Sequence, residues 1–180
     1  MEKKVIPYPM KLLSCTSEDL KGIFELYEYA TNHQKSKKTV AVWPTFEKSL
    51  VENAITEKRQ WKLVVEEQMA CVWTITFTDL QIWEEKNDDP AIYIHRIATH
   101  PHFRGNYYVK DIVTWAKSYA KAQQKRFIRL DTVGNNEKLI AYYTKAGFTF
   151  LGMFTLKNTD QLPAHYQDGP ACLFEIDLGE

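Results

Sequence analysis

A β–α–β pattern in the middle of the chain constrains the fold most strongly. The run Ala91 to Thr99 (AIYIHRIAT) is β-rich and apolar on both faces, which is typical of a central strand. The sequence then predicts an amphipathic helix over Asn106 to Gln123 and another strand over Phe127 to Thr132. This span has the length of a right-handed crossover, so we expect the two strands to lie parallel in one sheet.

The rest of the chain predicts further strands and helices around this unit. Two β-rich runs flank the polar pair Glu67 and Gln68, which indicates an antiparallel hairpin. Residues 79–90 are expected to form a polar, acidic loop, and Ser17 is a suitable N-cap for the first helix. The sequence therefore predicts an α/β fold with a sheet that is partly parallel and partly antiparallel. The remaining expected strands are 10–14, 61–65, 69–77, 148–157 and 171–178, and the remaining expected helices are 18–33, 45–58 and 136–146.

Composition narrows the class of protein. The chain has 180 residues, which suits a single domain over 1–180. It carries 23 basic and 23 acidic residues, and this balance argues against a nucleic-acid-binding protein. Cys15, Cys71 and Cys172 are far apart and have no metal-ligand spacing, so we expect buried thiols, a reduced compartment and no metal site. The N-terminus does not resemble a signal peptide and no apolar run is long enough to span a membrane, which predicts a cytoplasmic protein.

Two local motifs carry a resemblance to a known family. In residues 97–105 (IATHPHFRG) a hydrophobic residue ends the strand, a proline follows, and an Arg-Gly pair opens a turn. In residues 136–148 (NEKLIAYYTKAGF) Asn136 is followed by Tyr143 and then by Gly-Phe. Together, at this spacing and in this element order, they resemble the GNAT family of acetyl-CoA-dependent N-acetyltransferases over nearly the whole chain.

The resemblance implies the GNAT acyl-CoA N-acyltransferase fold, with acetyl-CoA as co-substrate. The implied activity is transfer of the acetyl group to a primary amine of a small molecule, by direct attack in a ternary complex. Two alternatives stay open: acetylation of a protein N-terminus or lysine, and a non-catalytic acyl-CoA-binding module that kept the fold. Neither nucleic acid nor a membrane is an expected partner, and a homodimer is left open.

The resemblance also implies where acetyl-CoA binds. The backbone at the end of the central strand would pair with the pantetheine arm as an additional strand. The turn that follows would hold the diphosphate at a helix N-terminus. The implied cofactor-binding residues are Ile97, Ala98, Thr99, Arg104, Gly105, Asn106, Tyr107, Tyr108, Val109, Asn136 and Tyr143.

This turn departs from the family pattern. The family usually has Arg-Gly-x-Gly-x-Gly or Ala, whereas this chain has Tyr107 and Val109 at the second and third small positions. Diphosphate binding needs backbone N–H groups at a helix start, so a side chain that points away is tolerated. Val109 is expected on the inward face of the helix. For Tyr107 two alternatives remain, because its ring either covers the diphosphate or occupies its place.

Two side chains are candidates for the chemistry. An amine of lysine-like basicity has a pKa near ~10.4, so it must lose a proton before it attacks a thioester. His95 is the best candidate for the base, with a buried structural histidine as the equal alternative. Strict alternation along the strand would place His95 on one face with Tyr93, Ile97 and Thr99, and Arg96 on the other. The resemblance implies that Tyr143 protonates the leaving thiolate, and of Tyr142 and Tyr143 one should face the core.

The acceptor site is the least specified part. The acidic segment 79–90 would attract a cation and Trp83 would stack on it, although a solvated surface loop is the better supported interpretation. The resemblance places Trp43, His165 and Tyr166 around the acceptor cleft. His165 is a second candidate for the base.

Overall fold

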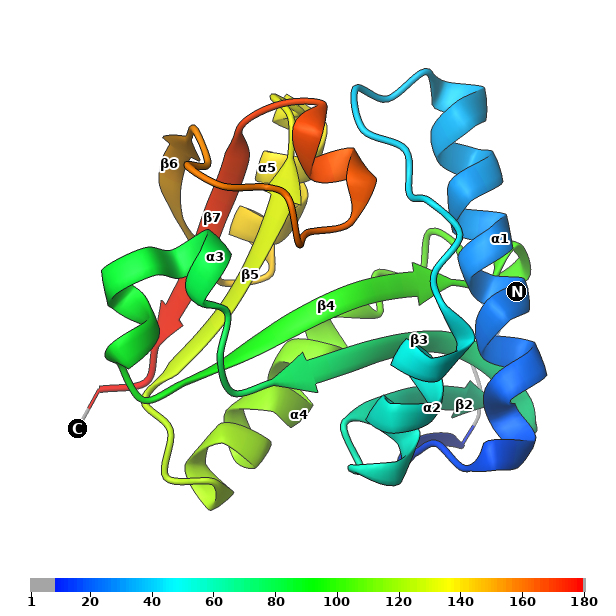
Figure 1. Ribbon diagram of the computed structural model, residues 1–180. Coiled ribbons are helices and arrows are strands. Elements are labelled where there is room, and N and C mark those ends of the chain that lie inside the picture. Colours follow the sequence, from blue (N-terminus) through cyan, green and yellow to red (C-terminus); the bar gives the residue numbers. More distant parts are fainter. Residues whose placement is uncertain (1–8, 180) are drawn as a thin grey trace, which may run out of the picture.

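The central crossover expected from the sequence is confirmed. In the computed structural model, which describes residues 9–179, β4 (Ala91–Thr99) and β5 (Phe127–Val133) are parallel neighbours. The chain between them forms α4 (Val109–Ala122), and the described strands make one sheet in the order β1-β2-β3-β4-β5-β7-β6 (Figure 1). The other strands are β1 (Met10–Ser14), β2 (Gln60–Val65), β3 (Gln68–Thr76), β6 (Thr149–Phe154) and β7 (Ala171–Asp177). The other helices are α1 (Leu20–Lys37), α2 (Lys48–Thr56), α3 (Leu80–Trp83) and α5 (Glu137–Lys145), with 3₁₀ helices η1 (Ser17–Asp19), η2 (Glu84–Asp88), η3 (Pro101–Phe103) and η4 (Ala164–Gln167).

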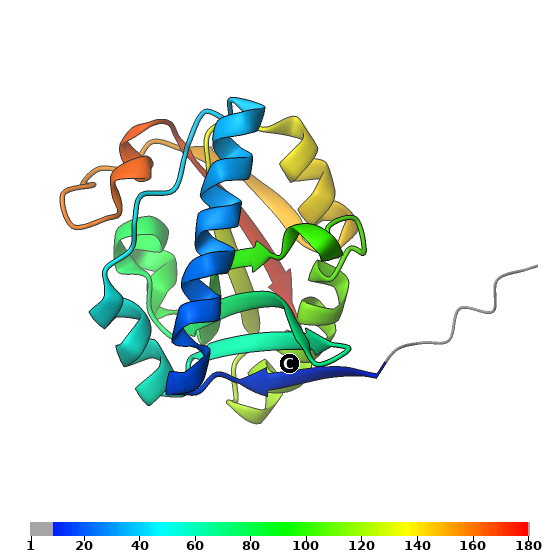
Figure 2. The same ribbon diagram turned by 90° about the vertical axis from the view of Figure 1, so that its right-hand side faces the viewer.

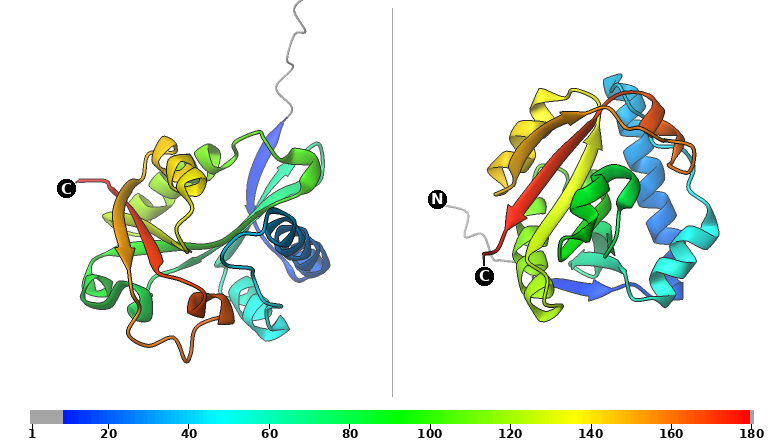
Figure 3. Two further views of the ribbon diagram at one scale, coloured as in Figure 1. Left: turned by 90° about the horizontal axis from the view of Figure 1, so that it is seen from above. Right: turned by 60° about the vertical axis from the view of Figure 1, so that its left-hand side comes forward.

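The helices divide between the two faces of the sheet. Seen from above, α4 and α5 cover one face, whereas α1, α2, α3 and η4 lie on the other (Figure 3). The largest apolar cluster lies under α4 and includes Ile92, Ile112 and Ile128, all fully buried. Smaller clusters lie under α1 and under α3. No helix in residues 9–179 is both long and apolar enough to cross a membrane.

β4 and β5 are hydrogen-bonded neighbours over only a short stretch. Their register pairs Ala91 with Phe127 and ends at Tyr93 with Arg129. Beyond that pair the two strands diverge, which Figure 1 shows as the widening angle between them. The edge of β4 that faces β5 therefore has no partner strand from Ile94 onward in the described part of the chain.

A β-bulge in β4 overturns the side-chain alternation that the sequence predicted. Ala98 is opposite Val72 and His95 is opposite Thr74, so Arg96 and Ile97 together face the single residue between these partners. Arg96 has a left-handed backbone, with φ of 51°. Because of the extra residue, the side chains that follow His95 point to the opposite faces of the sheet from those that strict alternation would give.

The contacts on each side of the sheet show this correction. Ile97 packs into the cluster under α4, and Thr99 donates to the sulfur of Cys71 in the same cluster. The guanidinium of Arg96 donates to Tyr27 of α1 and to Thr74, so it lies on the face of His95. The expectation that Ile97 and Thr99 share that face, with Arg96 opposite, is wrong because of the inserted residue.

Some predicted element boundaries also needed correction. The helix expected from Asn106 begins at Val109, because residues 105–108 form the turn before it. The segment 79–90 is not a solvated loop, since it forms α3 and η2 and buries Ile82 and Trp83 at 4% and 2% exposure.

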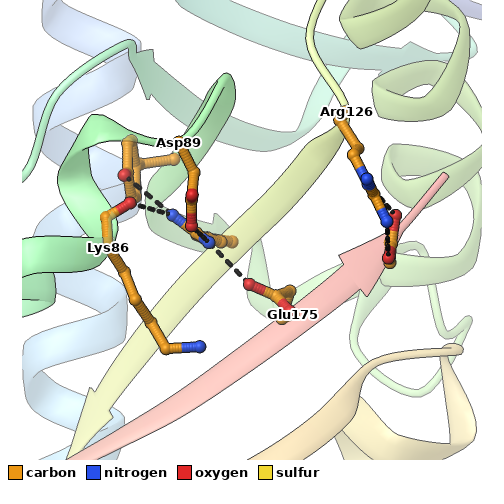
Figure 4. Close-up of polar contacts among 7 residues, drawn as sticks. Lys86, Asp89, Arg126 and Glu175 are labelled. Atoms are coloured by element: carbon orange, nitrogen blue, oxygen red, sulfur yellow. Dashed lines mark hydrogen bonds and ion pairs between the residues drawn. The ribbon is translucent and has the colours of Figure 1, made fainter. Parts of the chain in front are cut away.

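Arg129 holds this segment against the sheet. Its fully buried guanidinium donates to Glu175 of β7 at 2.8 Å, to the Lys86 carbonyl at 2.6 Å and to Asp89 (Figure 4). It also lies 4.7 Å from the centre of the Trp83 ring. A buried charge is stable only when it is paired and hydrogen-bonded, and the acidic residues near η2 provide this pairing.

We predict that Arg129→Met destabilises the protein by about 3–5 kcal/mol, because the substitution leaves the largely buried Glu175 carboxylate, 15% exposed, and the Lys86 carbonyl without their donor. Urea unfolding measures the loss. Arg126→Ala is the matched control, since Arg126 forms an exposed ion pair with Asp177 at 2.8 Å in the same region (Figure 4). An equal loss in both variants would contradict the role of burial.

Candidate active site

The turn before α4 keeps the backbone of a glycine turn without the usual glycines. Gly105 has φ of 88° and Tyr107 has φ of 59°, so both are left-handed. Tyr107 occupies the second small position of the family pattern, and a left-handed backbone costs a non-glycine residue roughly 1–2 kcal/mol. The shape of the turn is therefore retained at an energetic cost. Val109 is buried at 1% exposure, as expected for the inward face of α4.

The Tyr107 ring packs against α5. Its hydroxyl donates to the Tyr142 carbonyl at 3.0 Å, and the two tyrosine rings meet edge to face at 5.0 Å. The Lys145 ammonium lies 5.1 Å from the centre of the Tyr107 ring. These contacts give a physical reason for the unusual backbone, because the ring links the turn to α5.

Tyr142 is the side chain that reaches the start of α4. Burial raises the pKa of Tyr142 to about 12, while the interaction of its hydroxyl with the Val109 backbone N–H offsets part of the rise. The first N–H group of a helix is where an anion would bind. The side chain that would compete with an anion at this helix start is therefore Tyr142 rather than Tyr107.

The polar side chains predicted to bind the cofactor make local contacts. Arg104 donates to the Tyr29 carbonyl at the end of α1 at 3.0 Å, and Asn106 donates to the Phe103 carbonyl at 2.9 Å. Asn136 caps α5 by accepting from the Leu139 N–H at 3.1 Å. Within residues 9–179, the N–H groups of residues 105–108 donate to no protein oxygen. These N–H groups are thus available to solvent or to a bound anion.

Tyr143 is the inward-facing member of its pair. Its ring packs against Phe148 and Phe174 at 6.0 and 5.3 Å, whereas Tyr142 is 37% exposed. Burial, and then the nearby Tyr142, Cys71 and Asp131, raise the pKa of Tyr143 well above its ordinary value. The hydroxyl therefore stays protonated at neutral pH, and the raised pKa makes it a weaker proton donor than an ordinary tyrosine. Cys71 of β3 and Asp131 of β5 both act electrostatically on this hydroxyl.

Two tryptophans expected at the acceptor site have structural contacts. Trp83 is 2% exposed and its ring is covered by Arg129, so it offers no surface to an acceptor. The prediction that it stacks on the acceptor fails because the segment 79–90 folds inward. Trp43 packs edge to face with Tyr27 and Phe46 at 6.0 and 5.7 Å, next to α1.

A pair of half-buried carboxylates lies where β4 and β5 diverge. Asp79 belongs to the acidic segment that the sequence analysis expected to attract a cation, whereas Asp131 was not singled out. One oxygen each of Asp79 and Asp131 and a ring nitrogen of His95 lie within 4.8 Å of one another. Tyr166 donates to Asp131 at 2.8 Å, and the buried Oδ2 of Asp79 has no hydrogen-bond partner. The signal in the sequence was an acidic residue inside the apolar strand FIRLDT, but its partner is distant in the chain.

The environment strongly changes the proton affinity of these groups. Burial, and then the neighbouring Asp131, raise the pKa of Asp79 to about 8. Burial raises the pKa of Asp131 to about 6, although the Tyr166 hydrogen bond opposes the rise. The two acids thus share about one proton at pH 7. The same three ligand atoms have the spacing of a site for a metal ion.

The two histidines proposed as bases are poor proton acceptors. Burial, followed by Arg96 and Arg59, lowers the pKa of His95 to about 3. Its Nε2 is 2.8 Å from the Thr76 hydroxyl. Burial lowers the pKa of His165 to about 4, and its ring lies tilted against the Tyr166 ring, with the ring centres 4.5 Å apart. These values weigh against either imidazole as the base, since a useful base has a pKa near the operating pH.

With this geometry in view, comparison with known proteins identifies the family. Residues 46–148 match the Acetyltransferase (GNAT) family, and the chain belongs to it. A curated relative, the uncharacterized N-acetyltransferase YesJ of Bacillus subtilis (strain 168), is 30% identical over 74 residues, which are 41% of each chain. The match thus spans less than half the length of that relative.

Solved structures show the same fold. A GNAT-family acetyltransferase of Listeria monocytogenes 4b F2365 superposes with a TM-score of 0.75 at 24% identity, covering 94% of this chain and 95% of the other. The structure of yncA from Salmonella typhimurium with its cofactor acetyl-CoA gives a TM-score of 0.67 at 13% identity and covers 95% of both chains. At these identities the likeness concerns the fold.

We predict that Asp79→Asn raises stability most at alkaline pH. The folded-state pKa of Asp79, about 8, exceeds the unfolded value near ~3.9, so its stabilising contribution is complete below the unfolded value and disappears as pH rises through 8. An uncharged amide avoids this loss. We expect an increase of at least about 1 kcal/mol, or ~2–4 °C in Tm, at pH 8.5 and a smaller one at pH 5.

Thermal unfolding followed by circular dichroism at both pH values measures the effect. Asp88→Asn is the control, because Asp88 is exposed on the same segment. If both variants changed the Tm equally at the two pH values, ionisation of Asp79 would be ruled out as the cause of the change.

Proposed function

We propose that the protein is an N-acetyltransferase that transfers the acetyl group of acetyl-CoA to a primary amine of a small molecule. The observation that carries the proposal is the gap between β4 and β5, with backbone donors at the start of α4 on one side and buried carboxylates on the other. The protonated Tyr143 hydroxyl, which interacts electrostatically with Asp131, is the acid in this proposal. A thioester in the gap would thus have an acid beside its sulfur and an acceptor site beyond its carbonyl.

Acetyl-CoA is the acetyl donor of the family, and this chain has matching features. The edge of β4 from Ile94 to Thr99 is unpaired toward β5, so a pantetheine arm can add there as an extra strand. The unpaired N–H groups of residues 105–108 point to anion binding at the helix start. Displacement of the Tyr142 hydroxyl from the Val109 N–H would free a further donor.

The reaction assigns one role to each group. The neutral amine attacks the thioester carbonyl, a C–N bond forms, and the oxyanion accepts a hydrogen bond from a β4 backbone N–H. The C–S bond then breaks, and the sulfur takes the Tyr143 proton. The oxyanion collapses to the amide carbonyl as the C–S bond breaks. The nitrogen loses its remaining extra proton through solvent, and this proton restores the Tyr143 hydroxyl.

Close packing beside Gly134, at the end of β5, supports a small-molecule acceptor over a protein segment. Val40, in the connection after α1, packs against Gly134 at the end of β5, where a Cβ would lie 3.0 Å from the Val40 Cβ. A Cβ on Gly169 would lie 3.1 Å from the Gly134 Cα. Figures 1 and 2 show this connection beside the β6–β7 connection that contains η4. These close contacts restrict access for a folded substrate.

We predict that acetyl-CoA and CoA both raise the apparent Tm, because a ligand that binds the native state stabilises it. Calorimetry gives the affinities. Tyr142→Phe should bind CoA about two- to tenfold more tightly, since a competing hydrogen bond to the Val109 N–H is lost. The absence of any shift at millimolar ligand would overturn the enzyme assignment and the binding-module alternative together.

A second prediction concerns Tyr143. Tyr143→Phe should lower kcat about 10²-fold, as expected for loss of a general acid, and leave the KM for acetyl-CoA nearly unchanged. Thiol release with a panel of primary amines measures the rate. Tyr119→Phe is the control, because Tyr119 packs on Trp61 and Trp115 beneath the sheet. Full activity of the Tyr143 variant would remove it from this role.

A further inference from the structure

We propose that Asp79 and Asp131 bind the ammonium group of the acceptor, and that Asp79 takes the proton that this group must lose before attack. The inference rests on the proposed function and names the acceptor class: a small, cationic primary amine. It also replaces histidine with a carboxylate as the base.

The position of the pair is set by the divergence of the strands. Tyr93 and Arg129 form the last parallel pair, and His95 and Asp131 follow two residues later on the same face. Asp79 reaches the same point from the residues between β3 and α3. The cluster therefore lies at the base of the gap, where an acceptor nitrogen would face the thioester.

The spacing suits an ammonium ion. Charge-assisted N–H···O bonds of ~2.8–2.9 Å around a tetrahedral nitrogen place their acceptors about 4.6–4.7 Å apart. The carboxylate oxygens of Asp79 and Asp131 and a His95 ring nitrogen all lie within 4.8 Å of one another. An ammonium group has three donors and no acceptor, so a set of acceptors is its complement.

The pair lacks a counter-charge in the protein. The buried Arg129 is engaged by Asp89 and Glu175, and Arg96 donates to Tyr27 and Thr74. Within residues 9–179, no basic side chain forms an ion pair with Asp79 or Asp131. The Oδ2 of Asp79 is buried and has no hydrogen-bond partner. Since a buried charge is unfavourable without a partner, a cationic ligand would provide what is missing.

The two acids differ in a way that assigns their roles. Asp131 accepts the Tyr166 hydroxyl and has the lower pKa, about 6, so it stays ionised and holds the cation. The pKa of Asp79, about 8, lies much nearer to that of an alkylammonium, ~10.4, than an ordinary carboxyl does. One ammonium N–H bond breaks and an O–H bond forms on Asp79. The freed nitrogen lone pair then attacks the thioester carbonyl.

The neighbouring groups with shifted pKa values titrate outside the range between pH 6 and 9. Burial lowers the pKa of His95 to about 3 and that of His165 to about 4. Burial also raises the pKa of Tyr93 and of Tyr166 above the ordinary tyrosine value. A pH dependence in this range would therefore report the carboxylate pair. The titratable and charged groups around it include Tyr93, His95 and Arg96 on β4, Arg129 on β5, Tyr143 on α5, His165 and Tyr166 on η4, and Cys172 on β7.

A binding experiment tests the ammonium site without requiring turnover. Butylamine and its neutral counterpart butanol are titrated into the CoA-saturated protein by calorimetry in buffers of different ionisation enthalpy. We expect butylamine to bind with proton release and butanol to bind at least about tenfold more weakly. Asp79→Asn and Asp131→Asn should each lose most of the butylamine affinity, whereas Asp88→Asn should retain it. Equal binding of both ligands, or full affinity in both cluster variants, would overturn the site.

A kinetic experiment tests the proton transfer. For an alkylamine, kcat/KM should rise with pH toward a plateau above about 8. Asp79→Asn should lower kcat/KM about 10²-fold and remove the part of the pH dependence that comes from the enzyme. For a weakly basic aromatic amine, which is neutral at pH 7, Asp79→Asn should lower kcat/KM less than tenfold. An unchanged rate in Asp79→Asn would overturn its role. Inactivation by a chelator with recovery on addition of a divalent ion would overturn the ammonium site in favour of a metal.

The two experiments separate this inference from the proposed function. If acetyl-CoA binds and butylamine binds through the pair but no amine is acetylated, the proposed enzyme activity and the proton transfer fail while the ammonium site stands. If amines are acetylated equally well by the Asp79 and Asp131 variants, the function stands and the inference fails. Thermal unfolding of each variant checks that the loss is not one of folding.

Discussion

The early parting of β4 and β5 is the constraint on which the rest of the structure depends. Their parallel pairing ends at Tyr93 and Arg129, and beyond this point the edge of β4 is unpaired toward β5. An unpaired strand edge inside a fold is costly unless another group covers it, and here the exposed donors and acceptors suit an extended ligand. The buried guanidinium of Arg129 secures the closed end of the gap by joining β5, β7 and η2.

The bulge in β4 determines which chemistry each side of the gap receives. Because one residue is inserted at Arg96, the strand sends Ile97 and Thr99 toward α4 and keeps His95 on the side of α1 and α3. Without the insertion, alternation would place Ile97 and Thr99 beside the carboxylates. The bulge therefore separates an apolar surface under α4 from a polar cluster on the opposite face.

The carboxylate cluster lowers the folding stability of the free protein, and in our proposal it is kept because it binds the acceptor. Asp79 and Asp131 are held close together without a basic partner, and their pKa values of about 8 and about 6 reflect the unfavourable burial of charge. A solvated or paired carboxylate would be more favourable for folding. In our proposal the acceptor brings the missing charge, so the energetic cost in the free protein becomes affinity and proton transfer in the complex.

The sequence by itself determined the order of elements, the parallel crossover and the family, because hydrophobic periodicity and the two motifs are local properties of the chain. It also predicted that one of Tyr142 and Tyr143 faces the core, since the pattern of α5 is helical, and the structure shows that this one is Tyr143. Only the tertiary structure decided that Trp83 is buried under Arg129, that Tyr142 meets the Val109 N–H, and that Asp79 lies beside Asp131. The physical reason is that burial and charge pairing depend on residues distant in the chain, whose proximity follows from the strand divergence and the bulge.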